Sequence, residues 1–389
     1  MALEVRMPTE PIPFYMHDLG AAELKAVAQV LRGPMLTTGE TVAHFERRFA
    51  DYLGARHALG LTSCTGGLHI SLLALGIGHG DEVITTPMTF IATATSIIEA
   101  GATPVFVDVE PDTGLLDPNR IEEAITPRTR AIVPVHLYGQ MCDMRALRDI
   151  ANRRGLFIVE DAAHCLEGAR DGVRPGLLGD TACFSFYATK NLTCGEGGAV
   201  VCNDDALFEK LRLLRLHGMT KTAADRAREG YQHWDMTLLG WKYNMDNIQA
   251  ALLLPQLDRL DANWIKRERL AAHYRKLFAG DPELICPVTR PGVKHAHHLF
   301  PVWPQGTPRD QLVIGLQRQG IGVVVNYRAI HLLSYFRERY GFRRGQFPHA
   351  EKIGDSTLSL PFYPNMPLEH ADRVAQALRQ ATIAVAKAA

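Results

Sequence analysis

The 389-residue sequence has no excess of either charge, because 42 lysine and arginine residues balance 42 aspartate and glutamate residues. A nucleic-acid-binding surface needs a basic excess or stripe, and none is found. The opening stretch "MALEVRMPTEPIPFYMHDLG" is interrupted by charges and prolines and lacks the apolar core of a signal peptide. No uninterrupted apolar run is long enough to span a bilayer. We therefore expect a cytoplasmic protein with neither a nucleic-acid nor a membrane partner.

Paired cysteine motifs are also missing. The seven cysteines are odd in number and include no C-x-x-C pair, which argues against a disulfide framework and a zinc site. We expect no bound metal and interpret the cysteines as buried free thiols of a reducing compartment. They are Cys64, Cys142, Cys165, Cys183, Cys194, Cys202 and Cys286.

Short apolar segments alternate with helical patterns through the first two-thirds of the chain. Strands that read as continuous apolar runs between helices indicate a mostly parallel sheet with both faces covered. The sequence therefore predicts one large α/β domain with helices at 65–77, 90–101, 117–125 and 143–155. Its seven strands are expected at 57–62, 82–86, 103–109, 131–137, 156–160, 182–186 and 199–202.

Strand signals stop after Cys202 for a long interval. The polar segment 217–235 is predicted to be a loop, and 245–280 reads as a long helix with a bend at Pro255. A smaller α/β unit should follow, and no internal repeat or low-complexity linker separates the two. We expect a large domain over 1–255, and a connecting helix with a small C-terminal domain over 256–389. The small domain should contain strands at 297–304 and 321–328 and helices at 308–320 and from 367 onward.

Ligands of open α/β sheets bind beyond the carboxyl ends of the strands, so the polar residues there are candidates. The first cluster is "LTSCTGG", where a strand runs into a helix. Free backbone N–H groups and the Thr65 hydroxyl at a helix N-terminus favour an anion such as phosphate. An ordinary helix cap by Ser63 or Thr65 explains the same residues equally well.

The second cluster is "LFIVEDAAH", in which Asp161 follows a fully apolar strand and His164 lies one turn further on. A buried carboxylate is costly unless it meets a cation or hydrogen-bond donors, and a protonated ring nitrogen of a cofactor is one such partner. Alternatively, Asp161 only caps the following turn and His164 is a half-buried structural histidine.

The third cluster, "SFYATKNLTCGEGG", contains Ser185 and Lys190 at a strand end. A lysine with a lowered pKa can form a Schiff base with a carbonyl group, although most lysines are simply solvated. A fourth stretch, "LLGWKYNMDNIQAALL", enters a helix, and its Trp241 and Tyr243 can equally be core aromatics. Together, a phosphate cup, a carboxylate for a ring nitrogen and a Schiff-base lysine meet the requirements of pyridoxal phosphate.

These motifs occur in order over nearly the whole chain, and the sequence resembles the DegT/StrS-type nucleotide-sugar aminotransferases. The resemblance rests on "LHISLLALGIGHGDEVITTPMTF", "GATPVFVDV", "VEDAAH", "KNLTCGEGG" and "KYNMDNIQAAL". It implies the fold of type I pyridoxal-phosphate transferases and a homodimer with its active site at the subunit interface. Within the family, "GWKYNMDNIQAAL" and "YRAIHLLSYFRERY" most resemble the enzymes that make UDP-4-amino-4-deoxy-L-arabinose.

The resemblance implies a role for each matching residue. Lys190 becomes the Schiff-base lysine, Asp161 the partner of the pyridine nitrogen, and His164 a neighbour of the ring. Phe90 matches the aromatic residue that stacks on the ring. The phosphate cup matches Cys64, Thr65 and Ser185.

Further positions match the substrate side and the second subunit. Thr37, Thr38 and His331 match residues near the sugar. Lys242 or Asn244 matches a phosphate contact donated by the neighbouring subunit. Two departures stand out, because many members have glycine in place of Cys64 and asparagine in place of Lys242.

The resemblance implies amino transfer from glutamate to the keto group of a nucleotide-linked sugar, with a UDP-linked 4-keto sugar as the first candidate. The product would serve cell-surface polysaccharide, lipopolysaccharide or amino-sugar biosynthesis. A 3-keto sugar or a dTDP- or GDP-linked sugar of secondary metabolism is the alternative. A sugar dehydratase is disfavoured because such relatives replace the lysine at position 190 with histidine. A pyridoxal-phosphate-binding regulatory protein is disfavoured because Asp161, Ser185 and Lys190 are all intact.

Overall fold

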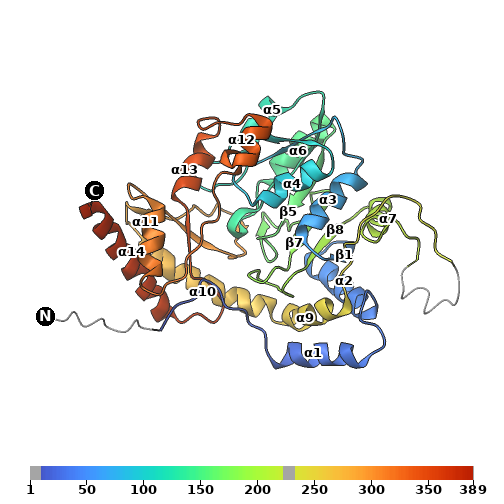
Figure 1. The fold of residues 1–389 in the computed structure, drawn as a ribbon, viewed down its shortest axis with the longest axis horizontal. Coiled ribbons are helices and arrows are strands. Elements are labelled where there is room, and N and C mark those ends of the chain that lie inside the picture. Colours follow the sequence, from blue (N-terminus) through green and yellow to red (C-terminus); the bar gives the residue numbers. More distant parts are fainter. Residues whose placement is uncertain (1–9, 222–232, 389) are drawn as a thin grey trace.

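A computed structural model describes residues 10–221 and 233–388 and contains a seven-stranded sheet (Figure 1). The strand order is β1-β8-β7-β5-β4-β2-β3, and every pairing is parallel except the two made by β8. All seven predicted strands are present, which confirms the mostly parallel sheet. They are β1 (His57–Leu61), β2 (Glu82–Thr85), β3 (Thr103–Phe106), β4 (Thr129–Ile132), β5 (Phe157–Asp161), β7 (Thr181–Ser185) and β8 (Gly198–Cys202).

Helices cover both faces of this sheet. Side chains of successive strand residues point to opposite faces, so Val200 packs with one helical layer and Val201 with the other. This arrangement explains the continuous apolar runs, because neither face meets solvent. One layer contains α3 (Cys64–Ala74), α4 (Ile91–Glu99) and α7 (Asp205–Leu214). The other contains α2 (Glu40–Leu53), α6 (Met144–Arg154) and α9 (Asn247–Asp258), with α1 (Ala21–Arg32) against α9.

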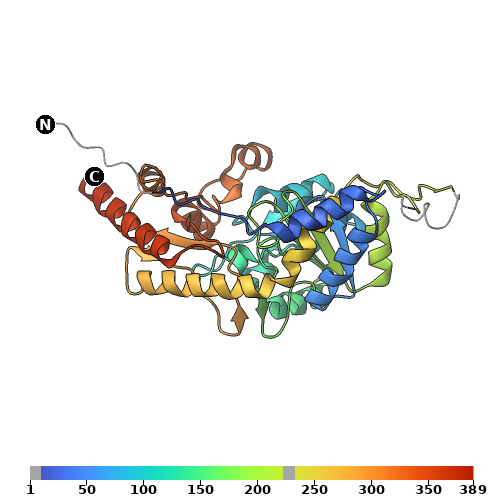
Figure 2. The same cartoon turned by 90° about the horizontal axis from the view of Figure 1, so that it is seen from below.

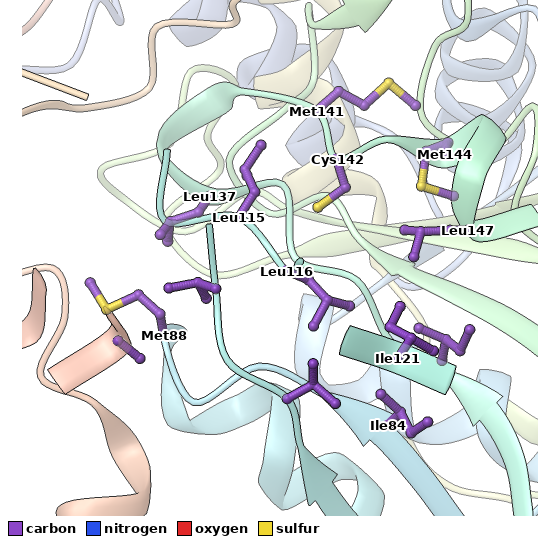
Figure 3. Close-up of a cluster of buried hydrophobic side chains, with 14 of the residues drawn as sticks. Ile84, Met88, Leu115, Leu116, Ile121, Leu137, Met141, Cys142, Met144 and Leu147 are labelled. Atoms are coloured by element: carbon purple, nitrogen blue, oxygen red, sulfur yellow. The ribbon is translucent and has the colours of Figure 1, made fainter. Parts of the chain in front are cut away.

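The largest apolar cluster joins the sheet to the loop at 137–142 (Figure 3). Ile84 and Ile121 lie at one end of the labelled side chains, and Leu137 and Met141 lie at the other. Leu137 is 1% exposed and Met141 is fully buried, so this packing fixes the short 3₁₀ turn η2 (Leu137–Gly139). The turn carries a backbone N–H group that the candidate site uses.

The remaining described part forms a smaller unit around α10 (Leu260–Phe278), which is drawn in gold in Figure 2. Its three-stranded antiparallel sheet has the order β12-β11-β9 and packs with α10 and the C-terminal helix. The elements are β9 (Leu284–Ile285), β11 (Phe300–Pro304), α11 (Arg309–Gln317), η3 (Ile330–Leu332), α12 (Ser334–Tyr340), α13 (Pro348–Ser356), β12 (Leu358–Leu360) and α14 (Leu368–Ala388). Short elements complete the chain: η1 (Pro118–Arg120), α5 (Ile121–Ala124), β6 (Ala169–Arg170) and β10 (Val293–Lys294).

Two sequence predictions are wrong in detail. Segment 321–328 is not a strand, because Ile321 makes an isolated bridge to Ile12 and Val324 one to Ser359, so no continuous ladder forms. The long helix predicted at 245–280 is not continuous: α9, which includes Pro255, ends at Asp258, and Arg259, whose φ of −112° is not helical, separates it from α10. The predicted bend at Pro255 stays a prediction. Part of the loop predicted at 217–235 lies outside the described residues.

The structure also bears on two expectations from the sequence, namely that the cysteines are unpaired and that no segment spans a membrane. All seven cysteines are free, and six are buried, with Cys286 partly exposed. This confirms that they are unpaired thiols. Within residues 10–221 and 233–388, no helix combines the length and apolar character needed to cross a membrane.

Candidate active site

The polar strand ends converge at one edge of the large sheet. Ser185 at the end of β7 is paired with Gly198 at the start of β8, and Gly198 is paired with Leu61 at the end of β1. Asp161 ends β5, the next strand on the other side of β7. Because parallel strands end at the same edge, the three predicted clusters lie together in space.

The N-terminus of α3 presents two free backbone N–H groups at this edge. The Ser63 hydroxyl accepts a hydrogen bond from Gly66 N at 3.0 Å, and Ser63 O accepts from Gly67 N at 3.2 Å. The backbone N–H groups of Cys64 and Thr65 have no acceptor among the described residues. The helix cap is therefore Ser63, and the two N–H groups left over are suited to an anion.

Gly198 allows β8 to approach this helix end closely. A Cβ atom at position 198 would lie 2.3 Å from Ser63 C and 2.4 Å from Cys64 N, far inside van der Waals contact. Cys64 itself is 8% exposed, and burial raises the pKa of its thiol well above the usual value. The thiol is thus a neutral, packed group, and the anion site depends on backbone donors.

Asp161 is 6% exposed and is held by two donors. Its Oδ2 atom accepts from the Thr93 hydroxyl at 2.7 Å, and its Oδ1 atom accepts from Ala163 N at 3.1 Å. Thr93 lies on α4, and its hydroxyl is 2.7 Å from the Thr89 hydroxyl. These two hydrogen bonds fix the orientation of the carboxylate.

Lys190 shares a small cavity with Ser185, His164 and His298. Its Nζ atom lies 3.4 Å from His298 Nε2. Burial lowers the pKa of Lys190 to about 8, although Asp161 and Cys64 act in the opposite direction. About a tenth of this amine is therefore uncharged near pH 7, and the uncharged form is the one that a nucleophile requires.

The neighbours of His164 determine where its proton lies. The backbone N–H of Tyr138 donates to His164 Nδ1 at 3.2 Å, so Nδ1 is unprotonated. Burial, followed by the charge of Lys190, lowers the pKa of His164 well below its usual value. The neutral ring must then carry its proton on Nε2, and it donates to the Tyr327 hydroxyl at 3.1 Å. The phenolic proton of Tyr327 is directed elsewhere.

Phe90 lies beside this group and is 54% exposed. It immediately precedes α4, and its ring centroid is 5.7 Å from that of Tyr327. The exposed ring is therefore open to contact with a ligand. The contact with Tyr327 places Phe90 at the same site as His164.

Lys242, Asn244 and Thr38 form a separate group. Asn244 Nδ2 donates to the Thr38 hydroxyl at 2.6 Å, and Lys242 Nζ contacts Asn244 Oδ1. Asn244 forms an isolated bridge with Leu61, on the far side of β1 from Gly198. Thr37 is exposed beside them. No contact among the described residues joins this group to Lys190 or Asp161, so its predicted part at the second subunit's site stays a prediction.

His331 lies in η3 and is fully buried. Its Nε2 atom is 3.1 Å from Glu351 Oε1, and its ring packs edge-on against Phe347 at 4.8 Å between centroids. Its only described polar partner is thus Glu351, within the small unit. A direct role at the sugar stays a prediction, and the geometry shows a residue that fixes the 330–332 turn.

Sequence reasoning missed four neighbours of the site, namely Thr93, His298, Tyr327 and Asn191. Asn191 Nδ2 donates to Glu167 Oε2 at 2.9 Å, and Glu167 is in turn paired with the buried Arg267. The "HAHHLF" histidines and the tyrosine of "VNYRAIH" were visible in the sequence as polar groups within apolar segments. Nothing local shows which of them turns toward Lys190.

The donor set fits a phosphorylated aldehyde cofactor. Free helix amides suit a phosphate, a carboxylate held by two donors suits a protonated ring nitrogen, and an amine with a lowered pKa suits a carbonyl carbon. These features, on a mostly parallel sheet with a smaller C-terminal unit, define a type I pyridoxal-phosphate-dependent transferase.

The chain belongs to the DegT/DnrJ/EryC1/StrS aminotransferase family, whose model matches residues 17–379. It is 41% identical over 374 residues to the spore coat polysaccharide biosynthesis protein SpsC of Bacillus subtilis, covering 95% of this chain and 96% of SpsC. The protein is a pyridoxal-phosphate-dependent sugar aminotransferase, and solved relatives carry this cofactor or its aminated form.

Two solved structures illustrate the similarity. DesV of S. venezuelae, solved with a ketimine intermediate, has a TM-score of 0.89 and 39% identity, covering 96% of this chain and 98% of DesV. DesI, solved in the presence of its TDP-sugar product, has a TM-score of 0.86 and 32% identity, covering 96% of this chain and 94% of DesI.

Proposed function

We propose that this aminotransferase moves an amino group from glutamate to the keto group of a nucleotide-linked sugar, with a UDP-linked 4-keto sugar as substrate. The observation that carries the proposal is the Lys190 amine, whose pKa is lowered to about 8 beside the carboxylate of Asp161. The product would enter cell-surface polysaccharide or amino-sugar biosynthesis in the cytoplasm. The similarity to SpsC, a spore coat polysaccharide biosynthesis protein, supports this direction.

Each side chain has a role in the proposal. Lys190 would anchor the cofactor, and its freed Nζ atom would carry a proton from the α-carbon of the amino donor to the carbon of the cofactor that receives the amino group. Asp161, oriented by Thr93, keeps the ring nitrogen protonated. Phe90 would stack on the ring, and His164 would lie close to it. When bound, pyridoxal phosphate supplies the carbonyl carbon and the ring that withdraws electrons from the reacting carbon.

The phosphate of the cofactor would be held at the start of α3. The amides of Cys64 and Thr65 and the hydroxyls of Thr65 and Ser185 are the proposed donors. The Ser185 Oγ atom accepts from Tyr187 N at 3.3 Å, which leaves its own proton free to donate. The positive end of the α3 dipole adds to this attraction.

Product analysis tests the substrate. The purified protein should be incubated with glutamate and a panel of UDP-, dTDP- and GDP-linked 3-keto and 4-keto sugars, and the products identified by mass spectrometry. We expect the amino sugar to accumulate fastest from the UDP-linked 4-keto sugar. Preference for a dTDP-linked sugar would favour the second candidate, which the similarity to DesI supports. Amination of none of them would overturn the proposal.

We also propose a homodimer in which Lys242 or Asn244 completes the phosphate site of the second subunit, with Thr37 and Thr38 near the sugar. Lys190→Ala and a Lys242→Ala/Asn244→Ala double variant should each be inactive alone. Co-expressed, they should form mixed dimers in which one site is intact, so part of the activity should return. Failure to complement in a verified mixed dimer would show that these residues act within one subunit.

A further inference from the structure

Five arginines line a cavity of about 600 Å³ between α11, α12 and α13. Its volume lies within the range of roughly 300–1,000 Å³ that is typical of small-molecule sites. Two aspartates, Asp310 and Asp355, also line it, so five positive and two negative charges leave an excess of three positive charges. The arginines are Arg309, Arg328, Arg337, Arg343 and Arg344. We call this cavity the arginine-lined pocket.

The two aspartates leave part of the positive charge unpaired. Arg328 is 3.2 Å from Asp310, and Arg344 is 2.7 Å from Asp355 and 3.8 Å from Glu351. Arg337 and Arg343 differ, because neither guanidinium has a hydrogen bond or ion pair with any residue of the described ranges. Both are exposed at the pocket, where their donors are free for a ligand.

One guanidinium of the pocket, that of Arg309, is buried and held by hydrogen bonds within the protein. The side chain of Arg309 is 5% exposed, and it donates to Gly354 O at 2.7 Å and to Asp310 Oδ1 at 2.9 Å. The remaining wall is apolar and includes Leu332, Leu333 and Phe342. A ligand that fits this lining has several anionic oxygens and a flat apolar part, because arginine forks match phosphate oxygens and an aromatic wall matches a ring.

The arginine-lined pocket and the candidate active site meet at one segment of the chain. Tyr327 faces His164, whereas the next residue, Arg328, lines the arginine-lined pocket. Ile330 N, two residues further on, donates to Pro87 O at 2.8 Å, so this segment is anchored to the large sheet domain. The two cavities share no lining residue among those described.

We propose that the arginine-lined pocket binds the diphosphate group of a nucleotide, with Arg337 and Arg343 on the phosphate oxygens and Phe342 beside the base. The nucleotide is either free or part of the sugar substrate, and the chemistry of recognition is the same for both. Binding itself does not depend on the reaction at Lys190.

Calorimetry on the full-length enzyme with bound cofactor tests this site, with UDP and inorganic pyrophosphate as probes. Removing both free guanidiniums in Arg337→Ala/Arg343→Ala should weaken binding about 100-fold, roughly tenfold for each lost charge-assisted contact. The control Arg269→Ala/Arg318→Ala removes two exposed arginines outside the pocket and should leave the affinity unchanged. Arg337→Lys/Arg343→Lys should be intermediate, because lysine keeps the charge and loses the fork.

Equal affinity of the pocket variant and the control variant would overturn the proposal, as would failure of the wild-type enzyme to bind either probe. Within the described ranges, the guanidiniums of Arg337 and Arg343 have no partner to lose, so the pocket variant should fold. The melting temperatures of the pocket variant and of the control variant without ligand should equal that of the wild type. A rise in melting temperature with pyrophosphate should occur in the control and not in the pocket variant.

Kinetics then separate the two sources of the nucleotide. If the pocket holds the substrate's own diphosphate, Arg337→Ala/Arg343→Ala should raise KM for the nucleotide sugar, and UDP should compete with that sugar. If the pocket holds a free nucleotide, the variant should keep the wild-type KM for the nucleotide sugar, and UDP should not compete with that sugar. The reaction with glutamate alone, followed by absorbance, should match the wild type in both cases. Loss of that reaction in the wild type would instead count against the proposed function.

Discussion

The candidate active site and the arginine-lined pocket both present cations, but the protein treats them in opposite ways. Lys190 is half-buried beside His298, and desolvation lowers its pKa to about 8. Arg337 and Arg343 are exposed, and a guanidinium stays charged at any physiological pH. Enclosure therefore gives a group that can gain and lose a proton, and exposure gives a permanent charge that can only attract an anion.

The carboxylates of the two sites also differ in burial. Asp161 is buried and accepts from Thr93 and Ala163 N, so its orientation is fixed before any ligand arrives. Asp310 and Asp355 are exposed at the pocket and pair with arginines in solvent, where such pairs contribute roughly 0–1 kcal/mol each. The first arrangement suits catalysis, which needs fixed geometry, and the second suits reversible binding.

The largest expected effect comes from placing a permanent charge in the enclosed site. Lys190→Arg should lower kcat for amino transfer by at least about 10⁴-fold, because arginine can neither move the proton nor attack a carbonyl carbon at neutral pH. Lys190→Ala should be equally inactive, since it removes the amine altogether. Turnover of either variant near the wild-type rate, measured by product mass spectrometry, would show that Lys190 is not the reacting lysine.

A smaller loss should follow when Asp161 loses its charge. Asp161→Asn should reduce kcat by about 10²–10⁴-fold, because an amide cannot hold a ring nitrogen protonated as a carboxylate does. Binding of pyridoxal phosphate, measured by absorbance titration, should weaken as well. Thr93→Val is the matched variant, since it keeps the carboxylate of Asp161 and removes one of its hydrogen-bond donors. Its fall in kcat should be smaller than that of Asp161→Asn. Full activity of Asp161→Asn would contradict the assignment.

Asp161→Asn should also change the pH dependence of the reaction between Lys190 and pyridoxal phosphate. The neutral amine attacks an aldehyde, so the rate at which the apoprotein captures pyridoxal phosphate should rise tenfold per pH unit below about 8 and level off above it. Asp161 raises the pKa of Lys190, so Asp161→Asn should move the midpoint to lower pH. Capture can be measured by borohydride trapping and mass spectrometry over pH 6–10. An unchanged midpoint would mean that Asp161 does not act on Lys190.

Gly198→Ala tests the anion site at the start of α3. The added Cβ atom would overlap Ser63 C and Cys64 N, so the helix end must shift. We expect the free energy of unfolding to fall by about 1–3 kcal/mol, the usual cost of overpacking, and affinity for pyridoxal phosphate to fall about tenfold. Gly195→Ala is a control, because its Cβ would meet open space. Its positive φ of 86° makes it strained, so only the cofactor affinity should be compared.

The sequence predicted the large sheet because its strands are buried on both faces and read as apolar runs. It failed in the small unit, where β9 has two residues and β12 three, too few for a periodic pattern. The segment 321–328 has strand-like composition, but tertiary partners decide its structure, since Ile12 and Ser359 each bridge one residue of it.

The site was predictable where polar residues lie at or soon after strand ends, as Asp161 and Ser185 do at the ends of β5 and β7 and Lys190 does five residues after β7. Thr93 and Tyr327 could not be found in this way. Thr93 lies on the inner face of α4, and Tyr327 is 163 residues from the histidine that it contacts. Their roles depend on packing between distant segments, which no local motif records.

Tyr327→Phe should give the smallest effect, because it removes one hydroxyl and keeps the ring beside Phe90. That hydroxyl accepts the proton of His164 Nε2, so its loss leaves a buried donor without a partner and frees the imidazole to turn. We expect kcat to fall about 2- to 10-fold, as one hydrogen bond of roughly 0.5–1.5 kcal/mol predicts, with nucleotide binding at the arginine-lined pocket unchanged. Steady-state kinetics beside UDP calorimetry on the same variant would measure both. A change in UDP affinity would show that the segment that contains Tyr327 and Arg328 couples the two sites. The two sites would then differ in their chemistry but would not act independently.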